Sequence, residues 1–280
     1  IGGGGFMVYH GDDGHATTFD FREKAPLAAT EEMYLGLDGR VVNNSNHIGI
    51  LAVGVPGTVA GIYKAHQELG SLPWEDLVAP AVALARDGIP INYSLETGFA
   101  RSANRFRQYP SSEQKFLKAD GSLYELGETW IQPDLANTLS LIQDNGRDGF
   151  YKGENAKKLA DFMTANGGLI TEEDLEIYQA VEREPIRGTY RGYDIVSMPP
   201  PSSGGVAMVE MLNMLEGYDL AAMGHNSADY LHVLTEVMRR SYADRAEHLG
   251  DPDFNESMPL TRLMDKDYAA TLRESIDMDK

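Results

Sequence analysis

The stretch that organises the N-terminal part of the chain reads Thr18-Phe19-Asp20-Phe21-Arg22-Glu23-Lys24-Ala25-Pro26. It follows a glycine cluster at residues 2–5 and an apolar run at residues 6–9. Residues 5–9 and 16–21 read as strands, and the turn Gly11-Asp12-Asp13-Gly14 between them predicts an antiparallel hairpin. Arg22 then comes where the second strand should end.

Arg22 is the first candidate for chemistry. Its planar guanidinium can donate two parallel hydrogen bonds to a carboxylate, and the acidic neighbours Asp20 and Glu23 can fix its direction. Asp20 lies two residues earlier, on the same face of the strand. Structural and surface ion pairs are the commoner use of such an arginine. From these residues alone, both a ligand-binding role and a structural role stay open.

Several stretches of the chain resemble the gamma-glutamyltransferases, a family of N-terminal nucleophile hydrolases. The opening glycines with Phe6-Met7 and the stretch from Asp20 to Pro26 carry the first part of the resemblance. Three later stretches follow in the same order, so the resemblance covers nearly the whole chain. They are Val55-Pro56-Gly57-Thr58-Val59-Ala60-Gly61, Ser197-Met198-Pro199-Pro200-Pro201-Ser202-Ser203-Gly204-Gly205, and Tyr242-Ala243-Asp244-Arg245 with Leu249-Gly250-Asp251-Pro252.

The resemblance implies an α/β (α+β) fold, the four-layer αββα sandwich of N-terminal nucleophile hydrolases. This chain should be helix-rich, should form one domain over residues 1–280 as part of a large subunit, and should be completed by a small subunit. By resemblance, Arg22 binds the alpha-carboxylate of the gamma-glutamyl donor. No cofactor and no metal are implied.

The resemblance also implies a precursor that cleaves itself into two subunits. The new N-terminal threonine of the small subunit is then the nucleophile, and its own amine can serve as the base. The Thr-Thr-His signature of the cut does not occur in these residues, so no catalytic residue is expected in this chain. The expected activity is transfer of a gamma-glutamyl group from glutathione or another gamma-glutamyl compound to water or an acceptor amino acid. Related acylases, acting on cephalosporin side chains or gamma-linked polyglutamate, and a non-catalytic binding module are the alternatives.

The composition of the chain excludes several classes of binding partner and site. The chain has 24 basic and 43 acidic residues, a net charge of −19, which argues against nucleic acid or an anionic membrane surface as a partner. It has no cysteine, which excludes disulfides and a cysteine nucleophile. No apolar run reaches the length of a membrane span. The resemblance to exported enzymes, with the missing cysteines, predicts a periplasmic or extracellular protein, and any targeting signal should lie before residue 1.

For the other groups of residues that could carry chemistry, the sequence favours structural roles. The opening glycines precede a strand and not a helix, which argues against a nucleotide site. Ser202 and Ser203 suit a helix start better than a nucleophile, because no histidine base is identifiable near them. The acidic and basic residues at 244–251 suit an ion-pair cluster better than an acid–base group. His10 and His15 flank a turn and lack a third metal ligand.

Periodicity and capping signals predict further elements along the chain. Residues 48–55 read as a buried strand and residues 108–128 as a long loop. The helix starting at Pro73 should turn Leu77, Ala81, Leu84 and Ala85 inward. Helices are predicted over residues 58–69, 73–87, 93–106, 133–145, 156–166, 171–178, 202–216 and 227–249, with a strand at 193–198 and helix fragments near Pro259 and Asp267.

Overall fold

The computed structural model describes residues 2–279 and divides them into two compact units. The first unit holds the described residues before Gly5 together with Arg22–Gln179. The second holds Gly5–Phe21 and the described residues from Ala180 onward. The chain therefore passes from one unit to the other next to Arg22. Compact packing does not establish independent folding, so the single domain over residues 1–280 stays a prediction.

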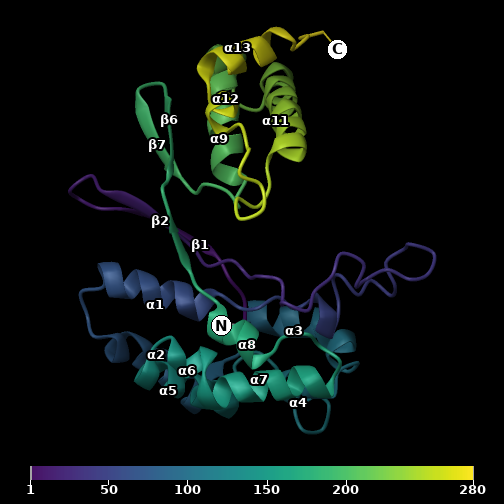
Figure 1. Ribbon diagram of the computed structural model, residues 1–280. Helices are drawn as coiled ribbons and strands as arrows, with labels where there is room; N and C mark the ends of the chain where they lie inside the picture. Colours follow the sequence, from purple (N-terminus) through teal and green to yellow (C-terminus); the bar gives the residue numbers. More distant parts are fainter. Residues whose placement is uncertain (1, 280) are drawn as a thin grey trace. The chain divides into compact units, whose positions relative to one another are not determined.

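Helices make up most of the first unit (Figure 1). Its two short strands, β3 (Ile89–Pro90) and β4 (Thr129–Trp130), pair with each other, and η1 (Ile50–Ala52) is a 3-10 helix. The Trp74 indole donates to the Ile142 carbonyl at 2.9 Å and so joins the second helix to the fifth. The helices are α1 (Thr58–Leu69), α2 (Trp74–Asp87), α3 (Tyr93–Phe106), α4 (Pro110–Phe116), α5 (Pro133–Asn145), α6 (Asp148–Tyr151), α7 (Gly153–Ala165) and α8 (Glu172–Ile177).

The predicted N-terminal hairpin is confirmed in the second unit. Strand β1 (Phe6–His10) pairs antiparallel with β2 (Ala16–Asp20), and β2 also pairs with β5 (Val181–Arg183). All five residues of β2 are buried because it is the central strand. Its buried threonine hydroxyls are satisfied across the sheet: Thr17 donates to the Glu182 carboxylate at 2.6 Å, and Thr18 donates to the Arg183 carbonyl at 2.7 Å.

A second hairpin joins β6 (Ile186–Tyr190) to β7 (Tyr193–Ser197). Its two-residue turn, Arg191-Gly192, has φ of 48° and 85°, the left-handed pair that a tight hairpin requires. Helices follow it to the end of the unit. They are α9 (Gly204–Leu215), α10 (Leu220–Met223), α11 (Ala228–His248), α12 (Leu260–Leu263) and α13 (Lys266–Glu274).

Three predictions about local structure are wrong. Residues 48–55 form no strand: Gly49 has φ of 103° and starts η1, and only Val55 bridges to Lys24. The predicted loop at 108–128 contains α4, with Pro110 at its first turn, a position that favours proline. Of the four residues of α2 predicted to face inward, Ala85 is buried, but Leu77 and Leu84 are 49% and 56% exposed and Ala81 is exposed as well. The remaining predicted helices are confirmed to within about three residues at their ends.

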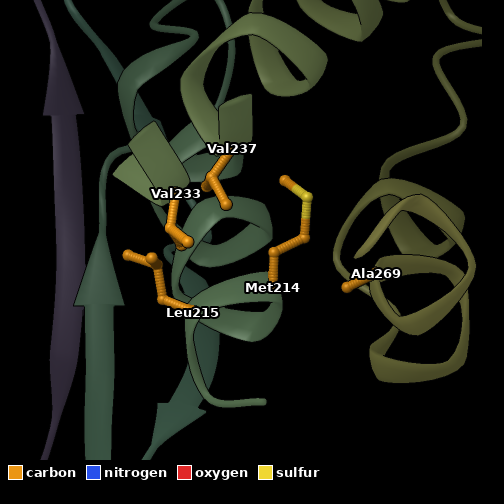
Figure 2. Packing of buried hydrophobic residues seen from close by; sticks show 5 residues of the cluster. All are labelled: Met214, Leu215, Val233, Val237 and Ala269. Carbon is orange, nitrogen blue, oxygen red and sulfur yellow. The ribbon is translucent and has the colours of Figure 1, made fainter. Parts of the chain in front are cut away.

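The core of the second unit lies where α9, α11 and α13 meet. Figure 2 shows Met214 and Leu215 of α9 facing Val233 and Val237 of α11, with Ala269 of α13 on the other side of Met214. Burying each large side chain of this kind stabilises the fold by about 1.5–3 kcal/mol. No helix among residues 2–279 combines the length and apolarity that crossing a bilayer requires.

One acidic side chain lies inside this helical packing. Glu210 of α9 is 1% exposed, and its Oε1 atom meets no donor among the described residues. Burial and a hydrogen bond to Asp244 raise the pKa of Glu210 to about 8. Two carboxylates have no donor between them unless one is protonated, so Glu210 carries the shared proton. Asp244 in turn accepts from the Tyr268 hydroxyl of α13 at 2.7 Å.

This pair makes stability depend on pH. The unfolded Glu210 releases its proton near its ordinary pKa of 4.5, whereas the folded one holds it until about 8, so its contribution to stability is lost as pH rises through that window. Glu210→Gln keeps a donor to Asp244 and does not titrate. We therefore expect the Tm of this variant, relative to wild type, to rise between about pH 5 and pH 8, by about 2–4 °C per kcal/mol recovered.

Calorimetry of the full-length protein across this range measures the effect. Glu247→Gln is the control, because that side chain is 76% exposed and its removal should leave the pH dependence unchanged. Parallel Tm curves for Glu210→Gln and wild type would show that Glu210 is ionised in the fold.

Candidate functional site

The backbone of Arg22 is held by a buried tyrosine. The Tyr178 hydroxyl donates to the Arg22 carbonyl oxygen at 2.7 Å. Tyr178 is 3% exposed and follows α8 directly as its C-cap residue. Arg22 itself is an exposed residue. The main chain of Arg22 is thus fixed while the residue keeps contact with solvent, as a ligand-binding side chain requires.

Tyr178 is in turn held by Tyr151 and Arg147, and we call these three residues the tyrosine clamp. The two rings stack with centroids 5.6 Å apart and planes 9° apart. The Arg147 guanidinium lies 4.7 Å from the centroid of the Tyr151 ring and donates to the Glu176 and Tyr178 carbonyls at 2.8 and 2.7 Å. Burial raises the pKa of Tyr151 to about 12, so its hydroxyl remains a donor, to the Pro56 carbonyl at 2.6 Å.

The tyrosine clamp therefore reaches the second motif of the sequence, the turn at residues 55–61. Lys24 and Val55 exchange two backbone hydrogen bonds, of 3.2 and 2.8 Å, beside Arg22. The amides of Gly57 and Thr58 both donate to the Gly3 carbonyl, at 2.8 and 2.9 Å. The first unit thus brings the opening glycines, the Arg22 segment and this turn together.

Gly54 lies where its own backbone closely approaches the segment that carries Arg22. A Cβ atom on Gly54 would lie 3.0 Å from Glu23 Cβ and 3.2 Å from the Lys24 carbonyl oxygen. A larger residue at position 54 would push the segment that carries Arg22.

The N-terminus of α8 holds the other end of the Arg22 segment. Asp174, 3% exposed, closes the capping box with Thr171, and its Oδ1 also accepts from the Leu27 amide at 2.6 Å. The sequence predicts the cap but not this second role, and it gives no signal for Tyr178. Both depend on segments about 150 residues apart, as the separations of 147 and 156 residues show.

Asp20 has a structural partner in the second unit. Its Oδ2 accepts from Arg183 Nε at 2.9 Å, and Arg183 also contacts Asp253 at 3.3 Å. This pair joins the central strand β2 to β5, with side chains 8% and 17% exposed. That Asp20 or Glu23 orients the Arg22 guanidinium stays a prediction.

The alternative sites in the second unit are structural. Ser203, at the N-cap of α9, accepts from Arg245 Nε at 2.8 Å, and Ser202 Oγ accepts from the Gly204 amide at 3.3 Å. No histidine contacts either serine among the described residues. Asp244 and Arg245 join α11 to α13 and α9 through the hydroxyls of Tyr268 and Ser203, so the predicted ion pairs are not what connects these elements.

Three histidines lie at exposed or boundary positions. His10 and His15 are exposed around the turn of the first hairpin. Within residues 2–279, no cluster of three or more histidine, aspartate or glutamate side chains has the geometry to hold a metal ion. His66 is partly exposed and contacts the Leu72 carbonyl through Nε2 at 2.8 Å, so it is a boundary residue of α1.

Known proteins match the chain over its whole length. The family model described as gamma-glutamyltranspeptidase covers residues 1–280. A glutathione hydrolase proenzyme of Pseudomonas sp. (strain A14) is 46% identical over all of this chain, which covers 48% of the relative. An acylase ACY 1 proenzyme of Pseudomonas sp. (strain SE83) is 38% identical over 99% of this chain and 50% of its own length.

A solved structure agrees in three dimensions. Gamma-glutamyltranspeptidase of Helicobacter pylori superposes with a TM-score of 0.98 at 42% identity, over 100% of this chain and 80% of that one. This similarity confirms the predicted fold class, a helix-rich chain of the N-terminal nucleophile hydrolase type. The chain spans about half the length of the curated relatives that it matches, 48% for the first of them. Over all of its residues, the chain belongs to the gamma-glutamyltranspeptidase family.

Proposed function

We propose that the protein containing this chain transfers or hydrolyses the gamma-glutamyl group of glutathione and related compounds. The family match over all 280 residues and the 46% identity to a glutathione hydrolase proenzyme support this activity. The donor would be a gamma-glutamyl compound, and the acceptor would be water or an amino acid.

The observation that carries the proposal is the fixed backbone of Arg22. Three independent contacts hold its segment: the Tyr178 hydroxyl at 2.7 Å, the Val55 backbone and the Asp174 carboxylate at Leu27. Because this backbone is already ordered, binding a ligand at Arg22 costs no further main-chain entropy. In this proposal, the Arg22 guanidinium binds the alpha-carboxylate of the donor through two parallel hydrogen bonds.

The chemical step would use residues outside this chain. We propose a small subunit, cut from the same precursor, whose N-terminal threonine attacks the gamma-carbonyl and forms an acyl-enzyme. Water or an amine then releases the glutamyl group. The word "proenzyme" in the name of the Pseudomonas relative supports a cleaved precursor. The role of the present chain is to orient the donor, and no catalytic residue is assigned to it.

A second candidate function is that of an acylase. The 38% identity to an acylase proenzyme favours it, because that relative matches the same residues. An acylase whose substrate lacks an alpha-carboxylate would not need Arg22, so the two functions differ in their dependence on that residue. A non-catalytic binding module would have neither activity, and it would have no partner chain that begins with threonine.

Replacing Arg22 tests the donor site. We expect Arg22→Ala to lower kcat/KM for a gamma-glutamyl donor by about 10²–10³-fold, because a bidentate charged contact of about 2–4 kcal/mol is lost. Arg22→Lys keeps the positive charge but loses the two parallel N–H donors of the guanidinium. We therefore expect this variant, too, to have a clearly lower kcat/KM. Precursor cleavage should be unaffected, which serves as the control for folding.

The sharpest comparison uses a donor that lacks its alpha-carboxylate. Wild type should process it about as poorly as Arg22→Ala processes the normal donor, and the variant should treat both donors alike. If Arg22→Ala still prefers the carboxylate-bearing donor as strongly as wild type does, Arg22 is structural and the assignment is wrong.

A variant of the tyrosine clamp should have a smaller effect on the kinetics than the replacement of Arg22. Tyr178→Phe removes the hydroxyl bond to the Arg22 carbonyl but keeps the stack on Tyr151. We expect KM for the donor to rise about 3- to 10-fold with a smaller change in kcat, because a single neutral hydrogen bond contributes about 0.5–1.5 kcal/mol. Tyr193→Phe, at a residue 74% exposed, is the matched control. Equal kinetics for Tyr178→Phe and wild type would show that this bond does not place Arg22.

The proposed small subunit can be detected directly. Mass spectrometry and N-terminal sequencing of the purified native protein should find a second chain that begins with threonine, because the chemistry requires that nucleophile. The interface should be large and apolar, as between halves of one folded precursor. An active protein made of this chain alone would contradict the proposal.

We also propose a periplasmic or extracellular location. The missing cysteines suit an oxidising compartment, in which a free thiol is reactive. Fractionation of the native host tests the proposal, and activity confined to the cytosol would disprove it.

A further inference from the structure

A cavity of about 770 Å³ opens in the first unit, and it is separate from the Arg22 segment and the tyrosine clamp, neither of which lines it. Its volume lies within the range of about 300–1,000 Å³ that small-molecule sites occupy. The walls come from the segment around η1, the end of α3, the start of α4 and the end of α7. Apolar surface prevails in the lining, to which Ile48, Val53, Phe106, Tyr109 and Phe162 contribute. Polar side chains, among them His47, Gln114 and Asn166, also line the cavity.

Two walls of this cavity are fixed by packing. Phe106 stacks on Phe116 with centroids 4.6 Å apart and planes 19° apart, and both rings meet Phe99 edge-on. Ile50 approaches Gly168 so closely that a Cβ there would lie 2.8 Å from its side chain. The cavity is therefore largely preformed, which lowers the entropy cost of filling it.

The charge of the lining is unusual for this chain. Although 43 of the 280 residues are acidic, the described residues that line the cavity include no aspartate or glutamate. They include Arg105, an exposed residue for which the described residues show no ion pair and no side-chain hydrogen bond. The hydroxyl-bearing residues Ser111 and Ser112 lie on the same lining. An unpaired guanidinium beside an apolar wall suits a ligand with an anionic head and an apolar body.

We propose that this cavity binds a small amphipathic monocarboxylate, such as a medium-chain alkanoate. Its carboxylate would pair with Arg105, and its chain would contact Ile48, Phe106 and Phe162. A phosphate ester or a dianion suits the cavity less well, because Arg105 is the one arginine or lysine among the described residues that line it. Neither Arg22 nor a residue of the tyrosine clamp lines this cavity.

Calorimetric titration of the full-length protein with sodium octanoate tests the proposal. We expect saturable binding that tightens by roughly 3- to 4-fold for each added methylene from hexanoate to octanoate, the gain of burying one methylene group. The neutral analogue 1-octanol should bind about 10-fold or more weakly than octanoate, because it lacks the charge-assisted contact.

Variants locate the two parts of the site. Arg105→Gln should weaken octanoate binding by about 10- to 100-fold and leave 1-octanol unchanged. Arg101→Gln, one turn earlier on α3 and absent from the lining, is the matched control and should bind octanoate like wild type. Phe162→Asp, at a residue 43% exposed, should abolish octanoate binding by placing an acid in the cavity.

Three results would overturn the proposal. The first is no saturable binding of octanoate by the full-length protein, which would mean that the cavity is filled or closed. The second is equal affinity for octanoate and 1-octanol. The third is equal weakening by Arg105→Gln and Arg101→Gln, which would assign the effect to net charge.

Discussion

The hydrogen bond from Tyr178 to the Arg22 carbonyl is the contact on which the candidate site depends. At 2.7 Å and with a donor only 3% exposed, it fixes the backbone next to the point where the chain passes between its two units. Tyr178 is held in position for this hydrogen bond because Tyr151 stacks on its ring and Arg147 donates to its carbonyl. The main chain of Arg22, the proposed donor-binding residue, is thus held in place by a buried hydrogen bond.

Backbone groups and hydroxyls, more than salt bridges, join the elements of this acidic chain. Asp174 accepts from the Leu27 amide, Arg245 donates to the Ser203 hydroxyl, and Asp244 accepts from the Tyr268 hydroxyl. With a net charge of −19, the chain has few cations to spare for its carboxylates. A buried glutamate such as Glu210 therefore keeps its proton, since desolvation disfavours the charged form and its neighbour is another acid.

The same shortage of cations makes an unpaired arginine informative. Arg183 pairs with Asp20 across the central sheet, and Arg240 pairs with Glu236 on α11. Arg105, in contrast, lines an apolar cavity from which acids are missing. The absence of acids from this lining, together with an arginine for which the described residues show no ion pair, is what points to an anionic ligand.

The sequence by itself determined the longer helices, the first hairpin and the family, but not the short helices α4, α6 and α10. Helix signals such as the Thr171 capping box of α8 are local, so the sequence predicts them correctly. Strand β5 was missed because it has three residues and is stabilised by partners 163–165 positions earlier. Arg22 could be named as a candidate from its motif, but only tertiary packing selected Tyr178, Asp174 and the turn at 55–61 to hold it, because hydrogen bonds between distant segments leave no periodic signal in the sequence.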